Sequence, residues 1–169
     1  MEIENKVDKS GLIQIDIKSY LKANSEFIGF DFKPVLWNEL VLKEKDFRDF
    51  CKTHDWSQYK DKYVYLYCSV DAVLPSWSYL LVTTFLHGIS TKTVIGTINE
   101  AKREQLLDAI NQLDLTEFKD GKMIVKGCSD IPYSNQILSS FISKVQSTAS
   151  SIMFGEPCST VPLYKKPKK

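Results

Sequence analysis

The stretch from Tyr63 to Thr97, YVYLYCSVDAVLPSWSYLLVTTFLHGISTKTVIGT, decides the fold class. It begins with Tyr63–Cys68, a run of β-branched, aromatic and aliphatic residues that is typical of a buried strand. A helix is predicted from Pro75, a favourable first helical position, to Gly88, a favourable stop. A short strand, Lys92–Thr97, follows. A strand–helix–strand unit of this kind joins two parallel strands through a right-handed crossover.

The same alternation continues downstream. Asn99 can cap a further helix, and Lys122–Lys126 reads as a strand after a turn. Ser134–Ala149 has the apolar spacing of a helix, and Ser151–Phe154 reads as a fourth strand. We therefore predict an α/β fold with a largely parallel sheet of about four strands and crossover helices. No glycine-rich phosphate loop follows these strands, which argues against a Rossmann nucleotide site. We expect no fold-level repeat.

The N-terminal third predicts an irregular α+β segment. Leu12–Ile17 alternates as a strand does, and Phe27–Phe32 is a second strand candidate. Lys43–His54 carries one apolar stripe at helical spacing. Cys51 shares that stripe with Phe47, so a buried packing role is expected for its side chain.

Length and composition favour one soluble domain. The chain has 169 residues, with 43% hydrophobic and 25% charged, so we expect a single α/β domain over residues 1–164 and a basic disordered tail over 165–169. The net charge of +1 argues against nucleic-acid or anionic-membrane partners. No run of about 18 apolar residues is present, so no transmembrane helix is expected. The polar start Met1–Lys6 lacks an apolar signal core, which predicts a cytoplasmic protein.

Three of the four cysteines share a local frame, and this frame is the main functional signal. Four cysteines are too few for a disulfide scaffold and should be thiols in a reducing cytosol. Cys68, Cys128 and Cys158 are each followed by serine, and each comes at or shortly after the end of a predicted strand. Because the carboxyl ends of parallel strands meet at one sheet edge, we expect these three thiols to converge.

Thiolates are the preferred protein ligands of zinc and of iron–sulfur clusters. The sequence therefore predicts a zinc ion or an iron–sulfur cluster held by the three Cys-Ser loops. Asp71, Asp130 or His54 is a candidate for a fourth ligand. The role would be in assembly, transfer or sensing rather than in turnover.

Two alternatives stay open at this point. One is a thiol-dependent enzyme with a nucleophilic or redox cysteine at the same edge. The other is a non-catalytic interaction protein whose cysteines are only structural, which should expose an apolar patch elsewhere. The sequence also leaves open whether the chain forms a homo-oligomer.

Five stretches carry a resemblance to a known family: Glu2–Val7, Leu42–Arg48, His54–Tyr59, Lys126–Asp130 and Gly155–Pro162. Over nearly the whole chain, the sequence resembles the bacterial domain-of-unknown-function family 2480. The resemblance implies an accessory role beside the sulfur-mobilisation proteins of iron–sulfur cluster assembly, which would then be partners. It implies no catalytic residue.

Overall fold

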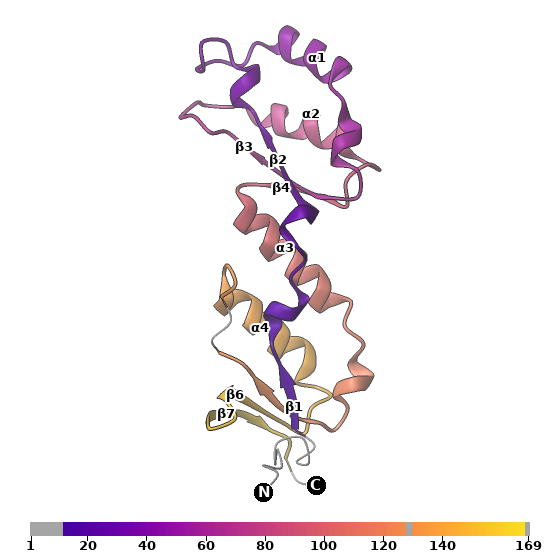
Figure 1. Ribbon diagram of the computed structural model, residues 1–169, viewed down its shortest axis with the longest axis vertical. Helices are drawn as coiled ribbons and strands as arrows, with labels where there is room; N and C mark the ends of the chain where they lie inside the picture. The colour runs from indigo at the N-terminus through magenta and orange to yellow at the C-terminus, as the bar shows by residue number, and fades with distance from the viewer. Residues whose placement is uncertain (1–11, 128–129, 168–169) are drawn as a thin grey trace, which may run out of the picture. The chain divides into compact units, whose positions relative to one another are not determined.

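The chain divides into two compact units in a computed structural model that describes residues 12–127 and 130–167 (Figure 1). Unit 1 combines residues 1–21 with 106–169, and unit 2 is the continuous segment 22–105. The expectation of a single domain over residues 1–164 stays a prediction. Within the described ranges, no helix is both long enough and apolar enough to cross a membrane.

Unit 2 is built on a parallel sheet with the strand order β2-β3-β4. Its strands are β2 (Phe27–Asp31), β3 (Tyr63–Tyr67) and β4 (Lys92–Ile95). Helix α1 (Glu44–Thr53) connects β2 to β3, and helix α2 (Ser76–Leu86) connects β3 to β4. Since both crossovers progress in one direction along the sheet, right-handed connections place both helices on the same face.

The core of unit 2 lies between that face and the two helices (Figure 1). Val64 and Leu66 of β3 are fully buried there, as are Phe47 of α1 and Val82 of α2. Removing these apolar side chains from water is the main term that holds the helices on the sheet. The helix α1 is further supported by an ion pair between Glu44 and Arg48, one turn apart.

Unit 1 is built on a mixed sheet with the order β1-β5-β6-β7. The strands are β1 (Leu12–Ile15), β5 (Lys122–Val125), β6 (Ser151–Glu156) and β7 (Ser159–Lys165). The first three are parallel, and β7 returns antiparallel to β6. Helix α4 (Ser134–Val145) and the C-terminal part of α3 (Ile98–Asn111) cover the core, where Leu106, Met123, Phe141 and Ile152 are fully buried.

The predicted α/β class with largely parallel strands is confirmed, but the strands are divided between two sheets. The predicted strands at 63–68 and 92–97 join β2, whereas those at 122–126 and 151–154 join β1. The β7 strand was not predicted, and Lys165 of the expected tail is its last residue. Lys166 forms an ion pair with Asp120 at 3.1 Å.

The expectation of no repeat is corrected, because both units contain the same turn before their middle strand. In unit 2, the carboxylate of Asp55 accepts the N–H of Ser57, and the N–H of Asp61 donates to the carbonyl of Ile89. In unit 1, Asp114 accepts the N–H of Thr116, and Asp120 donates to Thr148. Asp61 and Asp120 both have left-handed backbones, with φ of 59° and 53°.

Each residue of the turn in unit 2 and its counterpart in unit 1, such as Asp55 and Asp114, are separated by the same number of residues. The first residues of β3 and β5 have this separation too, and so do the first residues of β4 and β6. Gly96 after β4 and Gly155 within β6 are separated by the same number of residues as well, and their φ values are 137° and 123°. Such values are strained for any residue with a Cβ atom. Each unit is therefore a variant of one helix–turn–strand–helix–strand pattern.

Candidate functional site

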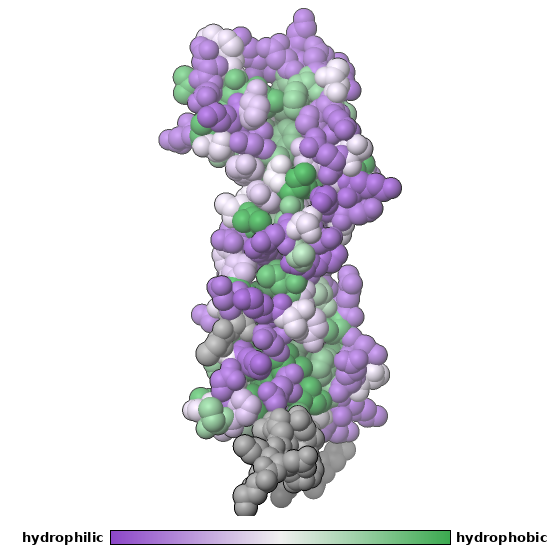
Figure 2. Space-filling model, in the orientation of Figure 1, coloured by the Kyte–Doolittle hydropathy of each residue, from purple (hydrophilic) through white to green (hydrophobic). Residues whose placement is uncertain are grey.

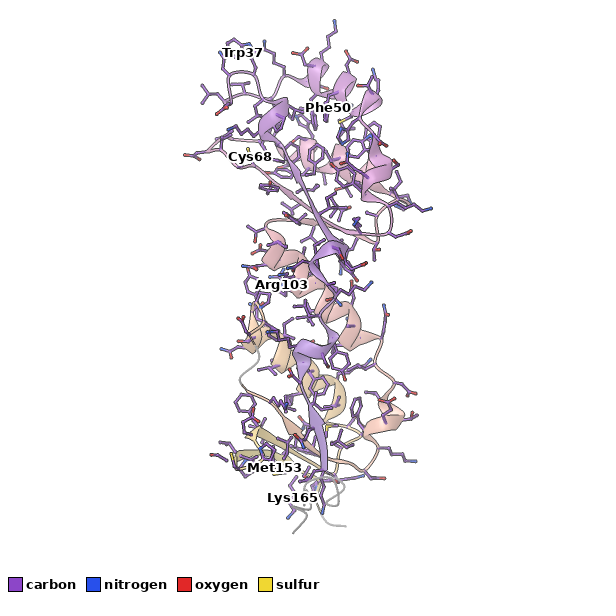
Figure 3. The ribbon with its side chains drawn as sticks, viewed as in Figure 1. Trp37, Phe50, Cys68, Arg103, Met153 and Lys165 are labelled. Carbon is purple, nitrogen blue, oxygen red and sulfur yellow. The ribbon has the colours of Figure 1, made fainter. Side chains whose placement is uncertain are left out.

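Cys68 follows β3 directly and is half-buried against the core of unit 2 (Figure 3). The next residue, Ser69, donates its N–H and its hydroxyl to the carboxylate of Asp31 at 3.0 and 2.6 Å. That carboxylate also accepts the N–H of Lys33 at 2.9 Å. Burial alone would raise the pKa of Asp31, but these hydrogen bonds lower it. Asp31 thus ties the Cys-Ser loop to the end of the neighbouring strand.

A phenol of helix α2 packs against the same core as Cys68. Tyr79 packs edge-on against Phe32, with ring centroids 4.8 Å apart. Burial raises the pKa of Tyr79, and the nearby Cys68 thiol raises it further. At neutral pH Tyr79 therefore keeps its proton and cannot act as a base for the thiol of Cys68.

Cys51 has the buried packing role that the sequence predicted. Its side chain is fully buried in α1, and the indole N–H of Trp56 donates to its carbonyl oxygen at 2.8 Å. Burial raises the pKa of Cys51 to about 11. The thiol therefore stays protonated at neutral pH and packs as a small apolar side chain.

His54, one candidate for a fourth ligand, lies in an aromatic cluster at the end of α1. Its Nε2 atom is 3.3 Å from the hydroxyl of Tyr59 and 3.2 Å from the side-chain nitrogen of Gln58. The imidazole also lies close to the rings of Phe50 and Trp56, with centroid distances of 4.8 and 4.7 Å. Burial lowers the pKa of His54. Binding a metal through Nε2 would require both polar contacts to be given up.

In unit 1, Cys158 is exposed in the turn between β6 and β7. The neighbouring strand β5 runs parallel to β6, with Val125 opposite Phe154. Gly127, just past β5, lies against the ring of Phe154, which a Cβ atom at Gly127 would overlap. The chain leaving β5 and the turn with Cys158 therefore share one edge of the sheet. The second predicted ligand of this unit, Cys128, lies outside the described residues.

The remaining predicted ligands, Asp71 and Asp130, are both exposed. In the part of the chain that the structure describes, no three His, Cys, Asp or Glu side chains form a group that could hold a metal ion. Cys68 belongs to unit 2 and Cys158 to unit 1. A metal site formed by Cys68, Cys128 and Cys158 therefore stays a prediction.

Unit 2 also has a surface that was not predicted from the sequence, which we call the hairpin surface. It consists of the exposed turn residues Trp37, Leu40 and Val41 and of an adjacent groove of about 310 Å³. The groove is lined by Pro34, Val35, Leu36, Trp37, Lys43, Asp46 and Phe50. A sequence signal was present, since apolar residues flank the polar pair Asn38-Glu39 as they do in a short hairpin.

A family model described as "Protein of unknown function (DUF2480)" matches residues 1–166 of the chain. No curated protein matches it, and no solved structure does. The match supports the resemblance noted from the sequence and brings no residue roles with it.

Proposed function

Since the chain belongs to the DUF2480 family, whose description assigns no activity, we propose a function from its own residues. The protein is an accessory protein that binds a zinc ion or an iron–sulfur cluster through the thiolates of its Cys-Ser loops. Cys68, Cys128 and Cys158 are the ligands. Iron–sulfur assembly proteins are the partners that such a role requires.

The position and state of the thiols carry this proposal. Cys68 follows a parallel strand of unit 2, and Cys158 lies at the carboxyl edge of the parallel strands of unit 1; both are free thiols. Strand ends of this kind are where α/β folds hold their ligands. Cys51, in contrast, is buried with a raised pKa. Cys51 is thus a packing residue, whereas the thiols of Cys68 and Cys158 are accessible to solvent.

The loop of Cys68 also has ordered hydrogen bonds next to the thiol. Serine follows each of the three cysteines, and in unit 2 the Asp31 carboxylate fixes Ser69 in place. Groups around a thiolate ligand orient it and tune its affinity for a metal. The exposed carboxylates of Asp71 and Asp130 suit a fourth ligand better than His54, whose Nε2 atom already has two polar partners.

The test is the metal content of protein purified without oxygen. We expect bound zinc, or iron with acid-labile sulfide, in an amount that the single variants Cys68→Ala, Cys128→Ala and Cys158→Ala each reduce. Cys51→Ala is the matched control: it should keep the metal and lose about 1 kcal/mol of stability as a small core truncation. Protein that binds neither metal nor cluster would refute the proposal, and so would loss of metal in Cys51→Ala alone.

A second candidate, a non-catalytic interaction protein, is favoured by the hairpin surface. Exposed apolar residues that lie beside a groove are typical of protein–protein contacts. Figure 2 shows that hydrophobic residues reach the surface of both units among hydrophilic ones. The two candidates are compatible, because the thiols and the hairpin surface use different residues.

A further inference from the structure

The segment Trp37–Val41 is a tight hairpin with an unusual backbone. Trp37 and Val41 exchange two backbone hydrogen bonds of 2.8 and 3.2 Å, and the N–H of Leu40 also donates to the carbonyl of Trp37. The two residues at the tip, Asn38 and Glu39, have φ values of 51° and 57°. Asparagine tolerates this left-handed region, but glutamate adopts it at a cost. Strained positions of this kind cluster at sites with a function.

Two side-chain contacts join the hairpin to neighbouring residues of the chain. The ammonium group of Lys33 is 3.3 Å from the carboxylate of Glu39. The ammonium group of Lys43 lies over the indole ring of Trp37, 4.4 Å from its centroid (Figure 3 labels Trp37). The hairpin is therefore organised before any partner binds, and this lowers the entropy cost of binding.

The hairpin exposes three large apolar side chains to solvent. Trp37 is 54% exposed, Leu40 62% and Val41 52%. Tryptophan in particular is enriched among the residues that dominate binding energies. Three such residues on one rigid turn form a projecting apolar knob.

The groove beside the hairpin offers a matching recess. Val35, Leu36 and Phe50 form its apolar part, and Lys43 and Asp46 place one positive and one negative charge along it. A knob and a recess on the same surface are what a two-fold symmetric contact needs, because each copy must supply both. Each copy also supplies both charges of an ion pair, since Lys43 of one copy can face Asp46 of the other.

We propose that the hairpin surface is the contact of a two-fold symmetric homodimer, in which the hairpin of each copy enters the groove of the other. The net charge of the chain, +1, produces little repulsion between copies. A strongly acidic or basic partner is a poorer match, because the groove carries both signs of charge. This inference does not depend on the cysteines or on any bound metal.

The first experiment measures the mass of the full chain in solution by sedimentation from micromolar to submillimolar concentration. We expect a reversible monomer–dimer equilibrium. Leu40→Asp should weaken dimerisation by about 100-fold, because each dimer carries the change twice. Leu80→Asp is the matched control: Leu80 is 61% exposed on α2 and lies outside the hairpin surface, so its dimer should persist.

The second experiment uses the charges, and its readout is the recovery of a dimer on mixing, which variants that are only less stable would not show. Lys43→Asp and Asp46→Lys should each be monomeric, because each pairs like charges twice across the two-fold axis. Mixed in equal amounts, they should form a heterodimer in which both contacts join opposite charges. Three results would overturn the proposal. The first is a wild-type chain that stays monomeric at all concentrations, which would assign the surface to a different protein. The others are a Leu40→Asp chain that dimerises normally and a mixture of the two charge variants that stays monomeric.

Discussion

Units 1 and 2 share a turn and differ in what they pack around it. In unit 2, the turn between Asp55 and Asp61 leads into a core rich in aromatic rings, among them Phe30, Phe47 and Trp56. In unit 1, the equivalent turn leads into a mainly aliphatic core. The difference shows that the hydrogen bonds and left-handed residues of the turn set the backbone path, whereas the core around it is exchangeable as long as its volume is filled.

The same comparison gives each unit its own spectroscopic signal. All three tryptophans, Trp37, Trp56 and Trp77, belong to unit 2, and so do both histidines, His54 and His87. Tryptophan fluorescence therefore reports on unit 2, whereas circular dichroism reports on the helices of both units.

The largest expected effect is the loss of a core ring. Phe47→Ala in unit 2 and Phe141→Ala in unit 1 each remove a fully buried phenyl ring, at a cost of about 3–5 kcal/mol of unfolding free energy. Because the two rings belong to separate clusters, Phe47→Ala should lower the denaturation midpoint seen by fluorescence more than Phe141→Ala does. Equal shifts in the fluorescence midpoint would contradict the treatment of the units as separate cores.

The next effect distinguishes the two equivalent glycines. A Cβ atom at Gly155 would overlap the backbone carbonyl of Ser159, whereas one at Gly96 would meet only the flexible side chain of Glu100. Both positions carry strain for alanine, so each substitution should cost about 1–3 kcal/mol, with Gly155→Ala the worse of the two. Thermal unfolding followed by circular dichroism measures the order, and a larger loss in Gly96→Ala would disprove it.

A pH effect from the side chain of His54 should appear in unit 2. Burial lowers the pKa of His54, so the unfolded chain binds a proton at that group more readily than the folded chain does. The contribution to stability is complete above about pH 6.5 and is lost as the pH falls through the lower folded pKa. The fluorescence midpoint should therefore drop more between about pH 7 and about pH 5 in the wild type than in His54→Asn. A wild-type slope in His54→Asn would contradict the assignment of the effect to His54.

The smallest effect concerns the two aspartates that cap the shared turn. A hydrogen bond from Ser57 lowers the pKa of Asp55, and one from Thr116 lowers that of Asp114. Each contributes stability above the ordinary pKa of aspartate, and this is lost as the pH falls through the lowered value. Asp55→Ala and Asp114→Ala should thus be slightly destabilised to a similar degree at neutral pH and match the wild type in strong acid. A loss in only one variant would show that the two turns are not equivalent.

The elements themselves were largely predictable from local pattern, but their pairing was not. Alternation and helical spacing fixed the strands and helices from Tyr63 to Phe154 to within a few residues. Which sheet a strand joins depends on contacts far apart in the sequence, such as Leu12 with Lys122. The strand β7 escaped prediction because it contains Pro162, which argues against a central strand; β7 is in fact an edge strand with an irregular register.

The candidate site was predictable only in part. The Cys-Ser frame identified segments that follow β3, β5 and β6, and the stripe shared with Phe47 identified Cys51 as a packing residue. The tie between Asp31 and Ser69 joins two strand ends across a long stretch of sequence, so no local pattern could reveal it. The repeat was hidden because the units share mainly turn residues, such as Asp61 and Asp120, while their core residues differ.

The insertion of unit 2 between β1 and the rest of unit 1 has a consequence for the order of folding. The ribosome releases β1 first, but its partner β5 follows only after the whole of unit 2 has been made. Unit 2 is continuous and pairs β2 with β3 and β3 with β4 as they emerge, so it can fold while synthesis goes on. Unit 1 must close a long loop before β1 finds β5, which makes it the slower unit. Until then, the segment Leu12–Ile15 has no strand to pair with. An unpaired apolar strand can pair with another chain, so this is the segment that a chaperone would need to protect.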